Sequence, residues 1–105
     1  MPKKKKRTWV NKEQIRNLST RTIQVRVSSF EKGLEIYNEI KVIRIVSAKY
    51  NLLIMSGFQP LLGEIQGEVT LISEENEYQI KDINAFYCFR KNVLKILIKE
   101  NENVL

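Results

Sequence analysis

Histidine is absent from this sequence, and cysteine, tryptophan and aspartate occur once each. Without histidine, the chain lacks the side chain that most often acts as a general base or a metal ligand. The single Cys88 cannot form an internal disulfide or a cysteine-based zinc site. A hydrolytic or metal-dependent site would have to be built from Glu, Lys, Ser and Tyr, which is uncommon. We therefore expect a protein that is not an enzyme and that holds no metal or cofactor.

Long hydrophobic runs are also absent. No stretch approaches the roughly 20 apolar residues of a membrane-spanning helix, and the charged start of the chain is not followed by the apolar region of a signal peptide. With 105 residues, of which 43% are hydrophobic, the chain is long enough for one domain with a single core. The sequence thus predicts a soluble, intracellular, single-domain protein.

Positive charge is concentrated at the start of the chain. Residues 1–21 contain eight Lys or Arg and one Glu, a net charge of +7, whereas the other 84 residues carry −1. The densest part is the run Lys3, Lys4, Lys5, Lys6 and Arg7. Adjacent like charges repel each other, so we predict a disordered start. Such a run suits a solvated tail, a docking arm for an acidic protein, a nucleic-acid or lipid contact, or a nuclear localisation signal.

Two observations bear on those alternatives. Lys, Ile and Asn supply 34 of the 105 residues, a bias typical of AT-rich coding sequences. This composition favours a low-GC bacterium, which has no nucleus. Because the rest of the chain is nearly neutral, the basic start does not indicate that the folded body binds nucleic acid.

A short helix is predicted directly after the basic run. Asn11 is a suitable N-cap with Gln14 at the N3 position, and Val10 and Ile15 occupy the two positions of a hydrophobic staple. We predict a helix over about 12–18, which is too short to be stable alone. Residues 1–21 are therefore interpreted as a basic N-terminal extension with a short helix.

From residue 22 the hydrophobic period changes to two. Ile23, Val25 and Val27 alternate with polar residues, which indicates a strand with one wet face. Further short apolar segments follow, separated by turn residues every eight to twelve positions: 34–37, 39–46, 51–55, 61–65, 69–73, 78–81, 83–89 and 93–98. This spacing is typical of an antiparallel β-sandwich or barrel.

The segment 51–62 reads N-L-L-I-M-S-G-F-Q-P-L-L. Because Gly57 permits a positive φ and Pro60 bars a central-strand position, residues 56–60 are predicted to form a loop with a fixed shape. The whole segment resembles the pattern F-G-I-L-P-G-H-A-P-L-L of the epsilon subunit of F-type ATP synthases. Residues 67–71 (G-E-V-T-L), 77–80 (E-Y-Q-I) and 91–97 (K-N-V-L-K-I-L) resemble later segments of that family in the same order. The resemblance covers about residues 22–98, leaving 99–105 as a short tail.

The resemblance implies an antiparallel sandwich of about ten short strands that performs no chemistry. Such a subunit belongs to the central stalk of a rotary ATPase, at the inner face of the cell membrane. It binds the gamma subunit in a hetero-oligomer with alpha and beta, and it contacts the membrane c-ring in motors that are attached to one. A motor without an ion channel would carry a similar subunit.

Individual positions carry over from the family pattern. Ser28 corresponds to a serine that faces gamma, Asn51 lies near an acidic position that faces the c-ring loop, and Phe58 replaces a histidine near gamma. The resemblance therefore proposes these partner-binding residues: Ser28, Asn51, Gly57, Phe58, Gln59 and Pro60. A half-buried loop phenylalanine is the alternative interpretation of Phe58.

Two features depart from the family. Its C-terminal pair of helices has no counterpart before residue 105, so no nucleotide-binding or regulatory role is expected. The basic extension, in turn, is an addition. Together with scattered aromatic residues, it leaves a rival of another class, a small basic β-barrel that binds nucleic acid.

Overall fold

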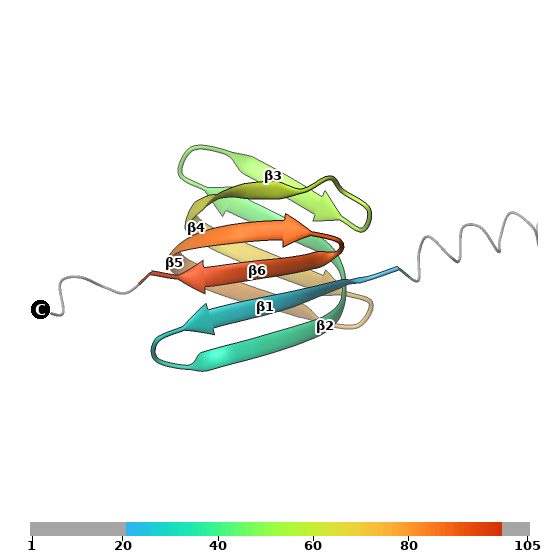
Figure 1. Cartoon of the computed structure of the whole chain (residues 1–105), viewed down its shortest axis with the longest axis horizontal. Helices are drawn as coiled ribbons and strands as arrows, with labels where there is room; N and C mark the ends of the chain where they lie inside the picture. The colour runs from blue at the N-terminus through green and yellow to red at the C-terminus, as the bar shows by residue number, and fades with distance from the viewer. Residues whose placement is uncertain (1–20, 100–105) are drawn as a thin grey trace, which may run out of the picture.

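The computed structural model describes residues 21–99, which form six β-strands and no helix (Figure 1). The strands are β1 (Ile23–Ser29), β2 (Gly33–Ser47), β3 (Asn51–Met55), β4 (Leu61–Ser73), β5 (Glu77–Arg90) and β6 (Val93–Ile98). Within this part of the chain there is accordingly no helix long and apolar enough to cross a membrane. The predicted helix over 12–18, the basic run and the residues from 100 onward lie outside the described residues.

Five of the strands close into a barrel. The hydrogen-bonded order is β1-β6-β5-β4-β2-β3, and β1 also pairs with the first half of β2, which closes the ring. Five of the six pairings are antiparallel, and only β1 and β6 run parallel. β3 lies outside the ring, paired with the second half of β2. The prediction of a mainly β fold is confirmed.

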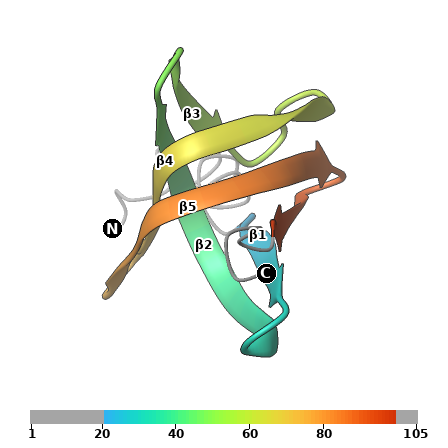
Figure 2. The same ribbon diagram turned by 90° about the vertical axis from the view of Figure 1, so that its left-hand side faces the viewer.

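The predicted sandwich of about ten short strands is not confirmed, because three strands are long. β2, β4 and β5 each cover two of the predicted segments. They bend at register shifts, where the ladder holds an extra residue. Two bulge residues, Glu39 and Asp82, have φ of 58° and 54°. The local pattern indicated the ends of strands at these bends, whereas the backbone continues around the barrel (Figure 2).

The core is a single cluster of apolar side chains inside the barrel. Inward residues alternate with outward ones along β1, β5 and β6, as a period of two requires. The buried hydrophobic residues are Ile23, Val25, Val27, Ile40, Ile43, Ile45, Ile54, Ile65, Val69, Leu71, Ala85, Tyr87, Phe89, Leu94 and Ile96. Every buried residue of this cluster lies on a strand. Close packing of these side chains makes the barrel a stiff support for the residues on its outer surface.

Candidate docking surface

The loop of residues 56–60, which joins β3 to β4, contains four of the six predicted partner-binding residues. It is fixed by one side chain from the β5–β6 turn: Asn92 Oδ1 accepts a hydrogen bond from the Gly57 amide (2.8 Å), and Asn92 Nδ2 donates to Ser56 Oγ (3.1 Å). The Asn92 carbonyl also accepts from the Gln24 amide of β1 (3.0 Å). One residue thus ties together three segments at this end of the barrel.

The loop presents its remaining residues to solvent. Gly57 has a φ of 89°, which favours glycine, and the Phe58 amide donates to the carbonyl of Met55 to close the turn. Phe58 is 40% exposed, and Gln59 and Pro60 are exposed as well. The conformation matches the prediction of a loop with a fixed shape.

The other two predicted residues lie far along the strands from this loop. Ser28 pairs with Leu97 near the end of β6, whereas the loop end of the barrel is marked by Gln24, which pairs with Val93. Asn51 begins β3 and pairs with Val46, whereas Met55 ends β3 and leads into the loop. The structure therefore brings Gly57, Phe58, Gln59 and Pro60 together and separates Ser28 and Asn51 from them.

Ser28 instead lies on a surface that the sequence analysis did not identify, which we call the apolar face. It is the outer side of β1 and β6 with the adjoining halves of β2, β4 and β5. Large hydrophobic side chains that are 47–83% exposed gather there: Phe30, Leu34, Ile36, Leu62, Phe86 and Leu97. Soluble monomers seldom expose so many neighbouring apolar groups, and such patches mark interaction sites.

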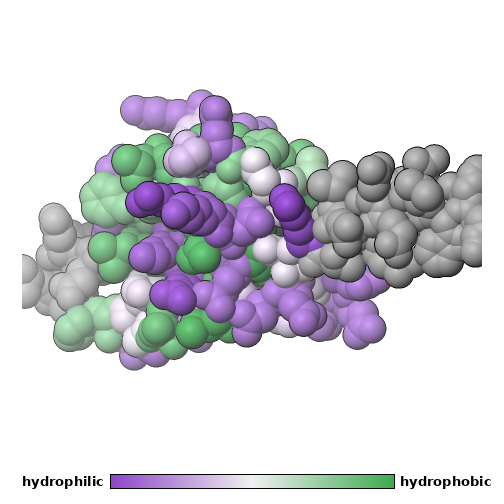
Figure 3. Space-filling view, turned by 45° about the vertical axis from the view of Figure 1, so that its right-hand side comes forward, coloured by the Kyte–Doolittle hydropathy of each residue, from purple (hydrophilic) through white to green (hydrophobic). Residues whose placement is uncertain are grey.

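Strand pairing places five of these six side chains in two rows across the sheet, and Phe30 lies beside them in the β1–β2 turn. Successive partners in the first row are Leu34, Ser28, Leu97, Phe86 and Glu64. Partners in the second row are Ile36, Arg26, Lys95, Cys88 and Leu62. A shallow hollow runs between the rows and is lined from Leu34 on β2 to Leu62 on β4. Figure 3 shows one side of the molecule, where hydrophobic residues (green) lie at the surface among hydrophilic ones (purple).

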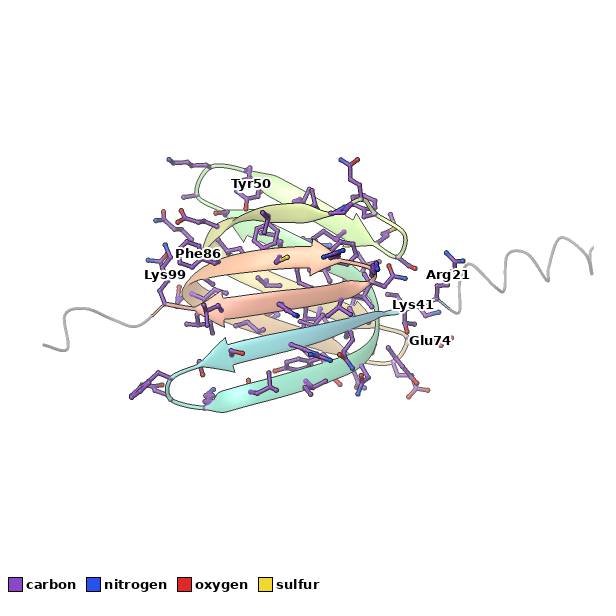
Figure 4. All side chains as sticks on the ribbon, in the orientation of Figure 1. Arg21, Lys41, Tyr50, Glu74, Phe86 and Lys99 are labelled. Carbon is purple, nitrogen blue, oxygen red and sulfur yellow. The ribbon has the colours of Figure 1, made fainter. Side chains whose placement is uncertain are left out.

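The two rows differ in charge. Arg26 and Lys95 lie side by side in the second row, and neither has an ion pair with another of the described residues. Arg26 Nε donates only to Gln24 Oε1 (2.7 Å). At the β4 end of the first row, Lys99 Nζ pairs with Glu64 (3.1 Å) and lies 4.2 Å from the centre of the Phe86 ring (Figure 4). The face is therefore apolar along one row and cationic along the other.

At the β4 edge of this face, Tyr50 links the turn between β2 and β3 to β4. Its hydroxyl donates to the carbonyl of Glu64 (2.5 Å) and lies 3.3 Å from the Tyr87 hydroxyl. Burial, with the Tyr87 hydrogen bond, raises the pKa of Tyr50 well above its ordinary value of 10.0. Burial also raises the pKa of Tyr37, with smaller contributions from Glu35 and Tyr78. Both tyrosines therefore stay neutral at neutral pH.

A sequence signal for the apolar face existed but was ambiguous. Leu62, Phe86 and Leu97 stand at outward positions of alternating strands, where a wet face would carry polar residues. An apolar residue on both faces also fits a fully covered strand, so the sequence alone does not distinguish the two cases. Asn92 carried no signal, since a turn asparagine needs no long-range partner.

No family model and no curated protein sequence matches this chain. Among solved structures, the fold is similar to a chain in the cryo-EM structure of the mitochondrial ATP synthase of Tetrahymena thermophila, central stalk and c-ring. The TM-score is 0.60 at 11% identity, and the match covers 78% of this chain and 66% of that chain. The present chain thus spans somewhat less than two thirds of the length of its neighbour, and at this identity the likeness concerns the fold.

Proposed function

We propose that this protein is a non-catalytic rotor subunit of an F1-type or F1-like rotary ATPase, equivalent to the epsilon subunit. The observation that carries the proposal is the match of the barrel to a chain from an ATP synthase central stalk and c-ring structure. The ordered resemblance of residues 22–98 to the epsilon family supports it independently, because the structural match uses backbone geometry and the resemblance uses residue types.

In this role the protein binds the gamma subunit and, through gamma, the alpha and beta subunits. The apolar face, which includes Ser28, supplies the main contact, and the loop with Phe58 supplies a second one. A third contact, near Asn51, touches the c-ring where the motor has one. The protein is then cytoplasmic and peripheral at the inner face of the cell membrane, and it contributes to ATP synthesis or proton transport without chemistry of its own.

Affinity purification of the tagged, full-length protein from its native cells tests the proposal. The extract is treated with nuclease and kept at moderate salt, and co-purifying chains are identified by mass spectrometry. We expect alpha-, beta- and gamma-like subunits. A c-ring subunit among them distinguishes an ATP synthase from a motor without an ion channel, and recovery of ribosomal or nucleic-acid proteins alone contradicts the proposal.

The loop contact has a test of its own. Phe58→Ala should weaken binding to the isolated gamma subunit by about 1–3 kcal/mol, because an exposed aromatic ring that becomes buried at an interface is a common anchor. Isothermal titration calorimetry measures the change, and an unchanged melting temperature shows that the fold is intact. Tyr78→Ala, which removes a similarly exposed ring elsewhere, is the control. Equal affinity of the Phe58 variant and the wild type assigns Phe58 to the loop alone.

A further inference from the structure

We propose that the apolar face binds an amphipathic, acidic α-helix of the partner subunit, laid across the strands. The inference rests on the proposed function for the identity of the partner, but the chemistry of the helix follows from the face itself. Two features of the face carry it: the length of its first row, and the two cations of its second row, which have no acidic partner among the described residues.

The length of the first row suits a helix. The row crosses five strands, from Leu34 on β2 to Glu64 on β4. At about 4.8 Å between strands this is about 19 Å, the length of about 13 helical residues. Ser28, the second of the five residues in the row, is smaller than its neighbours Leu34 and Leu97, and all three line the hollow on this face.

Charge specifies the flank of the helix. A helix that covers the first row brings one flank over Arg26 and Lys95 in the second row. Since neither cation has an acidic partner among the described residues, carboxylates on that flank would pair with both in a partly desolvated interface. The opposite flank faces the side of Phe30 and Lys99, and the Lys99 cation is already paired with Glu64.

The same charges exclude two other occupants. A second copy of the chain, docked face to face, would place the cations of one protomer near those of the other. The chain's own residues 1–21 carry a net charge of +7 and would meet the same repulsion. An anionic lipid surface or a nucleic acid would also satisfy the cations, so binding to either of them alone is an outcome that overturns the inference.

Site-specific photocrosslinking tests the inference on the full-length protein in its native cells. Benzoylphenylalanine replaces Leu97 on the face or, as a control, Leu53 on β3, which is exposed to a similar degree away from the face. We expect Leu97, and not Leu53, to crosslink to a helical segment with carboxylates on one flank. A synthetic peptide of that segment is then titrated against the purified protein.

Charge reversal makes the second step specific. Lys95→Glu should weaken peptide binding at least about tenfold, and a peptide with Lys in place of the facing carboxylate should restore it; Lys32→Glu, on the β1–β2 turn, should have little effect. A crosslink to a second copy, to residues 1–21 or to a basic segment overturns the inference. So does binding to phosphatidylglycerol vesicles, but to no protein, that is lost in Lys95→Glu.

The outcomes also separate the two proposals. If the protein co-purifies with ATPase subunits but Leu97 crosslinks to none of them, the inference is wrong and the proposed function stands. If Leu97 crosslinks to an acidic helix of a protein outside any ATPase, and charge reversal behaves as expected, the inference stands and the proposed function is wrong.

Discussion

The loop end of the barrel and the apolar face both present hydrophobic groups to solvent, but they are built differently. At the loop end, Asn92 holds the backbone of Gly57 and the side chain of Ser56, and one ring is exposed. On the apolar face, five large side chains are exposed on strands that need none of them for pairing, and Phe30 is exposed in the β1–β2 turn. Residue type at the loop end is therefore constrained by the fold, whereas residue type on the face is free to serve a partner.

In contrast to the exposed apolar face, the backbones of β2 and β4 are closely packed where these two strands pair. Gly67 lies so close to β2 that an added Cβ would collide with the backbone carbonyl oxygen of Val46. Gly67→Ala should lower the free energy of unfolding by about 3 kcal/mol, because backbone on both sides must shift. Urea denaturation measures this. Gln66, the neighbour of Gly67, has an exposed side chain, so Gln66→Ala should change stability little. Equal effects of the two substitutions would contradict the close packing of β2 against β4 at Gly67.

Asn92→Ala tests whether the hydrogen bonds of Asn92 stabilise the loop of residues 56–60. It leaves the Gly57 amide and the Ser56 hydroxyl without their partner and places alanine at a φ of 60°. We expect a loss of about 1–3 kcal/mol in the free energy of unfolding. Asn84→Ala, an exposed asparagine on β5, is the matched control. A loss no larger than that of the control would mean that the loop holds its shape without Asn92.

On the apolar face, the expected effect on stability is smaller. Leu62→Ser together with Leu97→Ser should change the free energy of unfolding by less than about 1 kcal/mol, since both side chains are largely exposed. The double variant should also elute earlier from a hydrophobic-interaction column. Ile65→Ser, on the same strand but fully buried, should unfold the protein. A large loss of stability in the double variant would mean that Leu62 and Leu97 contribute to the fold and are not available only for a partner.

Lys91→Asn should stabilise the turn that carries Asn92. Lys91 has a φ of 50° in the two-residue turn between Arg90 and Val93, a conformation that asparagine tolerates better than lysine. We expect the free energy of unfolding to increase by about 0.5 kcal/mol, as measured by thermal denaturation. Lys95→Asn, in the strand that follows, should give no such gain, and a gain at both positions would point to charge rather than to turn geometry.

The smallest effect at neutral pH concerns Tyr50 at the edge of the face. Because its pKa is raised in the folded state, the unfolded chain ionises first as the pH rises above about 10. The stability that Tyr50 contributes is therefore complete below that pH and is lost as the pH rises further. Tyr50→Phe should flatten this alkaline decline in urea denaturation, and an unchanged slope would contradict the role of Tyr50.

Local patterns predicted the strands well but not their number. The alternation of Ile23, Val25 and Val27 depends only on neighbours in the chain and identified β1 correctly. Glu39 and Asp82 interrupt the same alternation, and the sequence does not distinguish a bulge from the end of a strand. The two are distinguished by the pairing of the next strand, which is a long-range contact.

The candidate site shows the same division. The fixed loop of residues 56–60 could be predicted, because glycine and proline act on their own backbone. Asn92, which lies about 35 residues further along the chain, could not be found, because its two hydrogen bonds exist only after β5 and β6 have packed beside the loop. The predictions for Ser28 and Asn51 stay predictions, and the structure adds only their distance along the strands from the loop.

The sequence by itself determined the mainly β character, the near-neutral body behind a basic start, and the loop of residues 56–60, because these follow from residue type and spacing. Only the tertiary structure decided that the barrel closes and that Leu62, Phe86 and Leu97 face outward together. The physical reason is that these side chains come from three strands. Whether an apolar group is buried or presented to a partner depends on what the rest of the chain packs against it.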